Sequence, residues 1–172
     1  LSEGELAGER MQIAYSSNSQ EDEHSCFSDN THRDVWLNAE GVSNSFYGQY
    51  AGYDSNQDGT DDVTTNAVDG YGINDYLREV GLDSLADEAV TALAATQANY
   101  TAIDTQARAG SPFDVLIMED NHNSNNPVAL TIISLNKQSR VIQDIATELG
   151  LGSVVDEDAS SCDTSTPGVE CE

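Results

Sequence analysis

The stretch with the densest potential chemistry is residues 20–32, with the sequence QEDEHSCFSDNTH. It holds two of the chain's three histidines, His24 and His32, among carboxylate and hydroxyl side chains. Such a set can hold a divalent or ferric cation or carry out acid–base work, because imidazole and carboxylate groups both donate lone pairs. The ordinary alternative is that Asp29, Asn30 and Thr31 cap a helix while the acids face water. The two histidines can converge only if the segment folds back, since they are too far apart for one helical turn.

A second candidate is the acidic stretch at residues 54–62, DSNQDGTDD. Oxygen-bearing groups recur at alternate positions before a glycine, as they do in calcium-binding loops, where the glycine allows a sharp turn. The predicted calcium ligands are Asp54, Asn56, Asp58, the carbonyl of Thr60, and Asp62. The twelfth position is Thr65 and not the bidentate Glu of an EF-hand, so an acidic hydrophilic insertion is the open alternative.

The net charge of the chain limits the classes of molecule that it can bind. Its 172 residues include 31 Asp and Glu against 6 Lys and Arg, for a formal net charge of −25. Such a surface repels phosphate backbones, so we expect no nucleic-acid partner. Both simple solubility and adaptation to salty water would explain the excess of acidic residues. No stretch has the apolar length of a transmembrane segment. The sequence starts at Leu1, and we interpret it as a mature or trimmed product.

The three cysteines divide between two regions. Cys162 and Cys171 lie in a polar C-terminal stretch, close enough in sequence to close a small loop, and a disulfide there would suit an oxidising envelope compartment. Cys26 is either a buried thiol or the partner of one of the other two.

Periodic apolar residues predict helices at residues 1–17, 31–50, 73–79, 83–108 and 127–149. Four of these helices are long and amphipathic, and no alternating strand pattern occurs in the sequence. The sequence therefore predicts an all-α helical bundle with long acidic loops. We assign residues 1–151 to the bundle domain, with an acidic loop at 52–69, and residues 152–172 to an acidic C-terminal tail.

Three pairs of residues are spaced as signals for the start of a helix. The first two have the spacing of capping boxes, and the third places an N-cap before a proline. These pairs are Ser2 with Glu5, Thr31 with Asp34, and Asn126 with Pro127.

Four stretches together resemble imelysin-like proteins, also described as the insulin-cleaving or iron-regulated protein A family and as peptidase family M75. They are GELAGERM at residues 4–11, QEDEHSCFSDNTH at 20–32, FYGQY at 46–50 and SPFDVLI at 111–117. The resemblance is to the C-terminal half of the family and spans about residues 3–151. It implies ligand-binding roles for Arg10, Glu23, His24, Ser25, Ser28, Asp29, Asn30, Thr31 and His32.

The resemblance also implies a setting for the protein. The family consists of two similar helical halves, so we expect the N-terminal half of the same protein as a partner. The family signature GxHxxE belongs to that half and does not occur here, which suggests a fragment or a clipped half. Family members are exported to the bacterial periplasm or outer membrane. The resemblance implies a role in iron uptake, with iron or an iron-bearing ligand bound at an interdomain site.

Two other functions remain open. One is an M75-type metallopeptidase, which would combine GxHxxE with residues 20–32. A catalytic zinc needs about three protein ligands and one open position, and this chain alone offers no recognisable set. The other is a calcium-stabilised structural domain that docks partner proteins.

Overall fold

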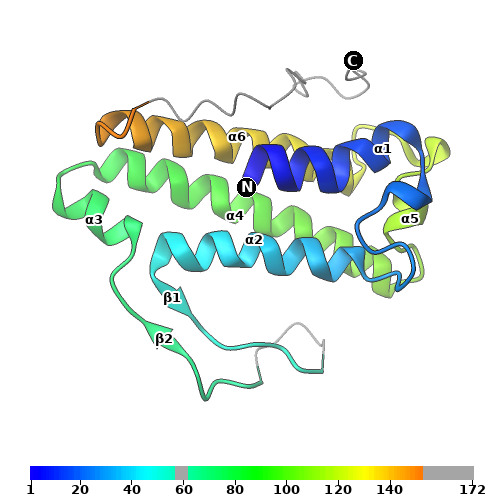
Figure 1. The fold of residues 1–172 in the computed structure, drawn as a ribbon, viewed down its shortest axis with the longest axis horizontal. Coiled ribbons are helices and arrows are strands. Elements are labelled where there is room, and N and C mark those ends of the chain that lie inside the picture. Colours follow the sequence, from blue (N-terminus) through cyan, green and yellow to red (C-terminus); the bar gives the residue numbers. More distant parts are fainter. Residues whose placement is uncertain (57–61, 153–172) are drawn as a thin grey trace.

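The computed structural model describes residues 1–56 and 62–152, which form a bundle of long helices lying side by side (Figure 1). The long segments are η1 (Ser2–Gln12) continued by α1 (Ile13–Ser17), α2 (Thr31–Tyr47), α4 (Asp83–Arg108) and α6 (Pro127–Glu148). The short helices are η2 (Gln20–Asp22), α3 (Ile73–Glu79), α5 (Phe113–Leu116) and η3 (Glu119–Asn121). The predicted all-α bundle is confirmed.

The first helical segment is wound as a π-helix over η1 before it becomes α-helical in α1. The predicted capping box at its start is absent. Ser2 is instead buried, and its Oγ accepts a hydrogen bond of 2.9 Å from Nε2 of Gln138 on α6. A π-helix brings residues five apart onto one face. Glu5 and Arg10 meet in this way, with 2.7 Å between Oε1 and Nη2.

Apolar side chains fill the space between the helices in two clusters. The larger cluster joins η1, α2, α4, α5 and α6, and it includes the fully buried Leu6, Tyr100 and Phe113. The smaller cluster lies around α3 and includes Phe46 and Leu77. Burying a side chain of this size contributes about 1.5–3 kcal/mol relative to exposure. The two clusters therefore fix the faces that α2 and α4 turn toward each other.

The last long helix begins as predicted, with Asn126 as its N-cap and Pro127 in its first turn. The Asn126 side chain is only 3% exposed. Its Oδ1 accepts from the backbone N–H of Val128 at 2.9 Å, and its Nδ2 donates to the carbonyl of Leu116 at 2.7 Å. One side chain therefore both caps α6 and ties α5 to it.

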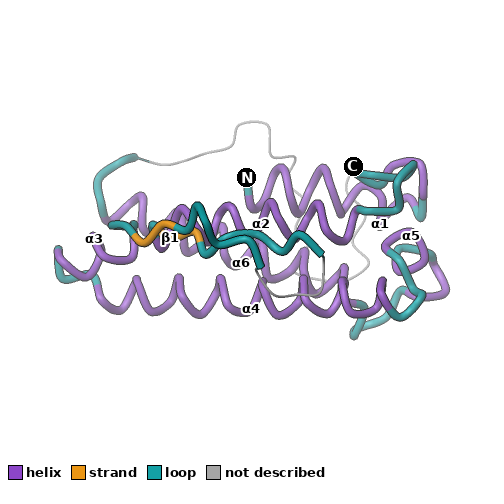
Figure 2. Tube along the Cα trace, turned by 90° about the horizontal axis from the view of Figure 1, so that it is seen from below, coloured by secondary structure: helices purple, strands orange, loops and turns teal. Residues whose placement is uncertain are grey.

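The second long helix ends earlier than predicted, at Tyr47, because Gly48 adopts the left-handed conformation with φ of 67°. A small antiparallel ribbon follows, in which β1 (Gln49–Tyr50) pairs with β2 (Val68–Asp69). The segment after β1 runs along the bundle and not away from it (Figure 2). Asp54 of this segment pairs with Arg33 of α2, which holds this part of the chain against that helix.

Gly48 and Gly72 cross so closely that a side chain at either position would collide with backbone. A Cβ on Gly72 would lie 2.3 Å from the carbonyl carbon of Tyr47. We expect Gly72→Ala to lower the free energy of unfolding by about 1–3 kcal/mol, because two backbone segments must separate. Urea denaturation followed by circular dichroism measures this change.

Gly41, in the interior of α2, supplies the matched control because nothing lies within 4 Å of a Cβ built there. Gly41→Ala should raise stability by up to about 1 kcal/mol through helix propensity. Equal stabilities for the two variants would contradict the close crossing.

Candidate functional site

The segment before α2 folds back onto the first turn of that helix. Asp34 of α2 accepts hydrogen bonds from Ser25 Oγ and, at 3.0 Å, from Asn30 Nδ2. The backbone N–H of Ser25 donates to Thr31 Oγ1 at 3.0 Å. Asp34 therefore does not complete the predicted capping box with Thr31. The N-cap residue is Asn30, and its side chain makes no capping hydrogen bond. The carboxylate of Asp34 instead holds the loop against α2, and this fixes the orientation of the neighbouring side chains.

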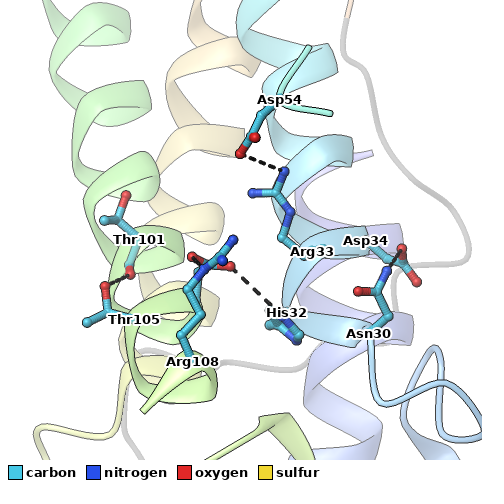
Figure 3. Close-up of polar contacts among 9 residues, drawn as sticks. Asn30, His32, Arg33, Asp34, Asp54, Thr101, Thr105 and Arg108 are labelled. Carbon is cyan, nitrogen blue, oxygen red and sulfur yellow. Dashed lines mark hydrogen bonds and ion pairs between the residues drawn. The ribbon is translucent and has the colours of Figure 1, made fainter. Parts of the chain in front are cut away.

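The two histidines of this segment have different partners. His24 is exposed, and its Nε2 lies 3.3 Å from Nη1 of Arg10 on η1. His32 points to α4, where its Nε2 lies 4.0 Å from Oδ1 of Asp104 (Figure 3). The loop thus brings His24 to one helix and His32 to another.

Buried polar side chains lie directly after η2 and on the facing turns of α2 and α4. Glu23 is 6% exposed and Asp104 is 5% exposed. Among the buried side-chain atoms of the described residues that have no hydrogen-bond partner are Glu23 Oε2, His32 Nδ1 and Asp104 Oδ1. Leaving a buried polar atom unpaired costs about 1–3 kcal/mol. On His32 and Asp104, whose side chains approach each other to 4.0 Å, such unpaired atoms point to a site that a further group completes.

The carboxyl of Glu23 is poorly placed to ionise. Burial is the main reason that its pKa lies above the usual range, and the carboxylates of Asp114 and Asp29 raise that pKa further. A hydrogen bond from Thr31 favours the ionised form and opposes them. The site can thus hold a proton on Glu23 more readily than an exposed glutamate would.

His32 has the opposite tendency. Burial lowers its pKa, while Asp104 and Asp29 raise it and the guanidinium groups of Arg108 and Arg33 lower it. Asp29 acts on both Glu23 and His32, so the three groups belong to one electrostatic neighbourhood. The arrangement favours a neutral imidazole that is able to accept or donate one hydrogen bond.

Sequence reasoning missed the contribution of α4. Tyr100, Asp104 and Arg108 are spaced four residues apart, so they share one face of that helix. Arg108 Nε donates to Asp104 Oδ2 at 2.7 Å. The hydroxyl of Tyr100 is buried without a hydrogen-bond partner among the described residues, and burial raises its pKa. The i, i+4, i+8 spacing of polar residues was the available signal, but it resembles a solvated face.

The remaining predicted residues of the loop lie on its outer side. Ser28 and Asp29 are exposed, and Asp29 adopts the left-handed conformation with φ of 52°. Phe27 is 100% exposed. Phe27 is thus the large apolar side chain that this loop presents on its surface.

The predicted calcium loop is only partly within the described residues. Asp54 is buried against Arg33, with 3.6 Å between its Oδ2 and Arg33 Nη2. Asp62 accepts hydrogen bonds from the backbone N–H and the hydroxyl of Ser55 at 2.9 and 2.8 Å. Asn56 is described, whereas Asp58 and Thr60 lie outside the described residues. Calcium binding stays a prediction.

Within residues 1–56 and 62–152, no group of three or more His, Cys, Asp or Glu side chains is gathered so as to hold a metal ion. Cys26 is half-buried and carries a free thiol. The predicted disulfide between Cys162 and Cys171 lies outside the described residues. The described helices include none that is long and apolar enough to cross a membrane.

The fold and the site together define an all-α bundle with a buried polar site where the loop before α2 meets α4. The model of the imelysin family (peptidase M75) matches residues 2–142. The chain belongs to the imelysin family. No curated protein matches it in sequence.

The lowered pKa of His32 has a consequence for stability. Near pH 6.5 the unfolded chain takes up the proton more readily than the folded one, so His32 lowers the free energy of unfolding as the pH falls. His32→Gln removes this contribution, and we expect stability to fall less steeply between pH 8 and 5.5, by at most about 1.4 kcal/mol per pH unit. Urea denaturation across this range measures the slope, with the exposed His24→Gln as the control. Identical slopes for His32→Gln and the wild type would refute the assignment.

Calcium binding at residues 54–62 has its own test. A cation held only by the folded chain raises the thermal midpoint. Millimolar calcium is therefore expected to raise the midpoint of the wild type, and Asp58→Ala should abolish the increase. Asp144→Ala, at an exposed position of α6, is the matched control and should retain it. A midpoint that ignores calcium, or an undiminished increase in Asp58→Ala, would eliminate this loop as the site.

Proposed function

We propose that this imelysin-family chain contributes half of a site that binds an iron-bearing ligand, as part of iron uptake in the bacterial cell envelope. The observation that carries the proposal is the set of unpaired buried atoms on Glu23, His32 and Asp104. Membership of the family supports the link to iron, which the resemblance implies for imelysin-like proteins.

The chemistry of the site favours iron enclosed in a ligand over a bare ion. A bare ferric ion needs several oxygen or nitrogen donors in one shell. The described residues offer instead hydrogen-bond acceptors on Glu23 and Asp104. They also offer the imidazole of His32, which can either donate or accept a hydrogen bond. Arg108 borders Asp104 as a positive group, and Arg10 lies beside His24. Such a set suits hydrogen bonding and charge recognition of an iron complex whose own atoms coordinate the metal.

The exposed Phe27 supports an interdomain arrangement. We expect the N-terminal half of the protein to cover the loop that carries it, so that the ligand is enclosed between the two halves. The resemblance extends the proposal to the periplasm or the outer membrane as the location.

The metallopeptidase alternative rests on the family's peptidase designation. It would require zinc ligands from the GxHxxE half, because the described residues of this chain do not gather three. Cleavage of insulin chain by the intact protein that a chelator abolishes would favour this alternative.

Calorimetry of the intact protein with ferric citrate and with haem tests the proposal. We expect one of these probes to bind with measurable heat. Glu23→Gln should weaken that binding about tenfold, because an amide replaces an ionisable acceptor without changing its size. Free ferric iron is titrated alongside to separate binding of the complex from binding of the ion.

The matched control is Glu21→Gln, which makes the same chemical change two residues away on an exposed side chain. It should bind as the wild type does. An intact protein that gives no heat with either iron complex would defeat the proposal, and so would a Glu23→Gln variant that binds as tightly as the control.

A further inference from the structure

A cavity of about 410 Å³ lies between α2 and α4, bordered by the segment that follows β1. Its lining includes Arg33, Trp36, Glu40 and Tyr47 of α2, Asp54 of the segment after β1, and Leu93 of α4. Glu23, His32 and Asp104 do not line it, so it is separate from the site described above. Its volume falls in the range of small-molecule sites, about 300–1,000 Å³.

One end of this cavity carries a buried ion pair. The side chains of Arg33 and Asp54 are 6% and 7% exposed, and they point at each other with 3.6 Å between them (Figure 3). The guanidinium also lies 5.2 Å from the centre of the Trp36 ring. The positive charge at this end is thus already opposed by a carboxylate and covered on one side by an aromatic ring.

The lining residues of α2 form a single helical face. Trp36, Glu40 and Tyr47 follow Arg33 at three, seven and fourteen residues, which are spacings that repeat on one side of a helix. Seven residues correspond to about 10 Å along the axis. Glu40 therefore lies away from the Arg33–Asp54 pair, with Trp36 between them along the helix and Tyr47 beyond Glu40.

We propose that this cavity binds a small organic ammonium compound with an apolar body. The lining holds one Arg and two acids, a net charge of −1, on a chain whose net charge is −25. That field attracts cations and repels anions. Asp54 stands beside Arg33 and disfavours a ligand carboxylate there. The ammonium group lies toward Glu40, and the apolar body contacts Trp36, Tyr47 and Leu93.

The chain contains a single tryptophan, Trp36, and it lines this cavity, so its fluorescence responds to a ligand bound there. The probes are phenethylamine, which is a cation at neutral pH, and 3-phenylpropionate, which carries the same ring on an anion. We expect a saturable change in emission with phenethylamine and none with 3-phenylpropionate over the same concentrations. The absence of a saturable change with phenethylamine, or equal responses to both probes, would overturn the proposal.

Two variants then locate the ammonium group. Glu40→Gln preserves size and removes the charge, and it should weaken phenethylamine binding about tenfold or more. Glu9→Gln makes the same change at an exposed position of η1, so it controls for the net charge of the chain. Its affinity should equal that of the wild type. If Glu40→Gln binds phenethylamine as tightly as Glu9→Gln, the cavity does not use Glu40 and the proposal is wrong.

Discussion

The arrangement of the site depends on one carboxylate, that of Asp34, which accepts hydrogen bonds from Ser25 and Asn30. These two bonds, with the Ser25–Thr31 contact, close the loop onto the first turn of α2. A loop so rich in acids would otherwise extend into water, because its charges repel one another. With the loop closed, Glu23 is buried, His24 lies beside Arg10 of η1, and His32 faces Asp104 of α4.

Burial of charge is the common feature of the two regions proposed to bind ligands. On α4 the buried Asp104 pairs with Arg108, whose side chain is 39% exposed, and in the cavity the buried side chains of Arg33 and Asp54 pair with each other. Buried ion pairs are weak contributors to stability, because removing both charges from water costs several kcal/mol. The two sets of buried charge are linked through adjacent residues of α2, since His32 faces Asp104 and Arg33 faces Asp54.

Local signals in the sequence predicted much of this fold. The apolar periodicity of residues 83–108 and the Asn126–Pro127 pair located α4 and the start of α6, because those features act within a few residues. The predicted helix extended past the observed end of α2 at Tyr47, because Tyr50, in the strand after Gly48, continues the apolar periodicity of the helix. The loop at residues 20–32 was recognised through its composition and its resemblance to a family.

Contacts between distant parts of the chain could not be predicted in this way. Nothing in the sequence around Asp104 or Tyr100 distinguishes them from residues on a solvated helix face. Asp54 was expected to serve a cation, yet it lies against Arg33. Both outcomes follow from how α2 packs on its neighbours, and no local pattern encodes that packing.

The π-helical winding of η1 determines which of its side chains share a face of the helix. Glu5 and Arg10 meet only because the helix is wide enough to align residues five apart. With ordinary α-helical winding, at about 100° per residue, Arg10 would lie about 140° around the helix from Glu5. The buried Leu6 and Met11 have the same five-residue spacing, so the π-helical winding fixes the apolar face of η1 together with the position of the guanidinium beside His24. A change of winding here would thus alter the packing of η1 and the Glu5–Arg10 pair at once.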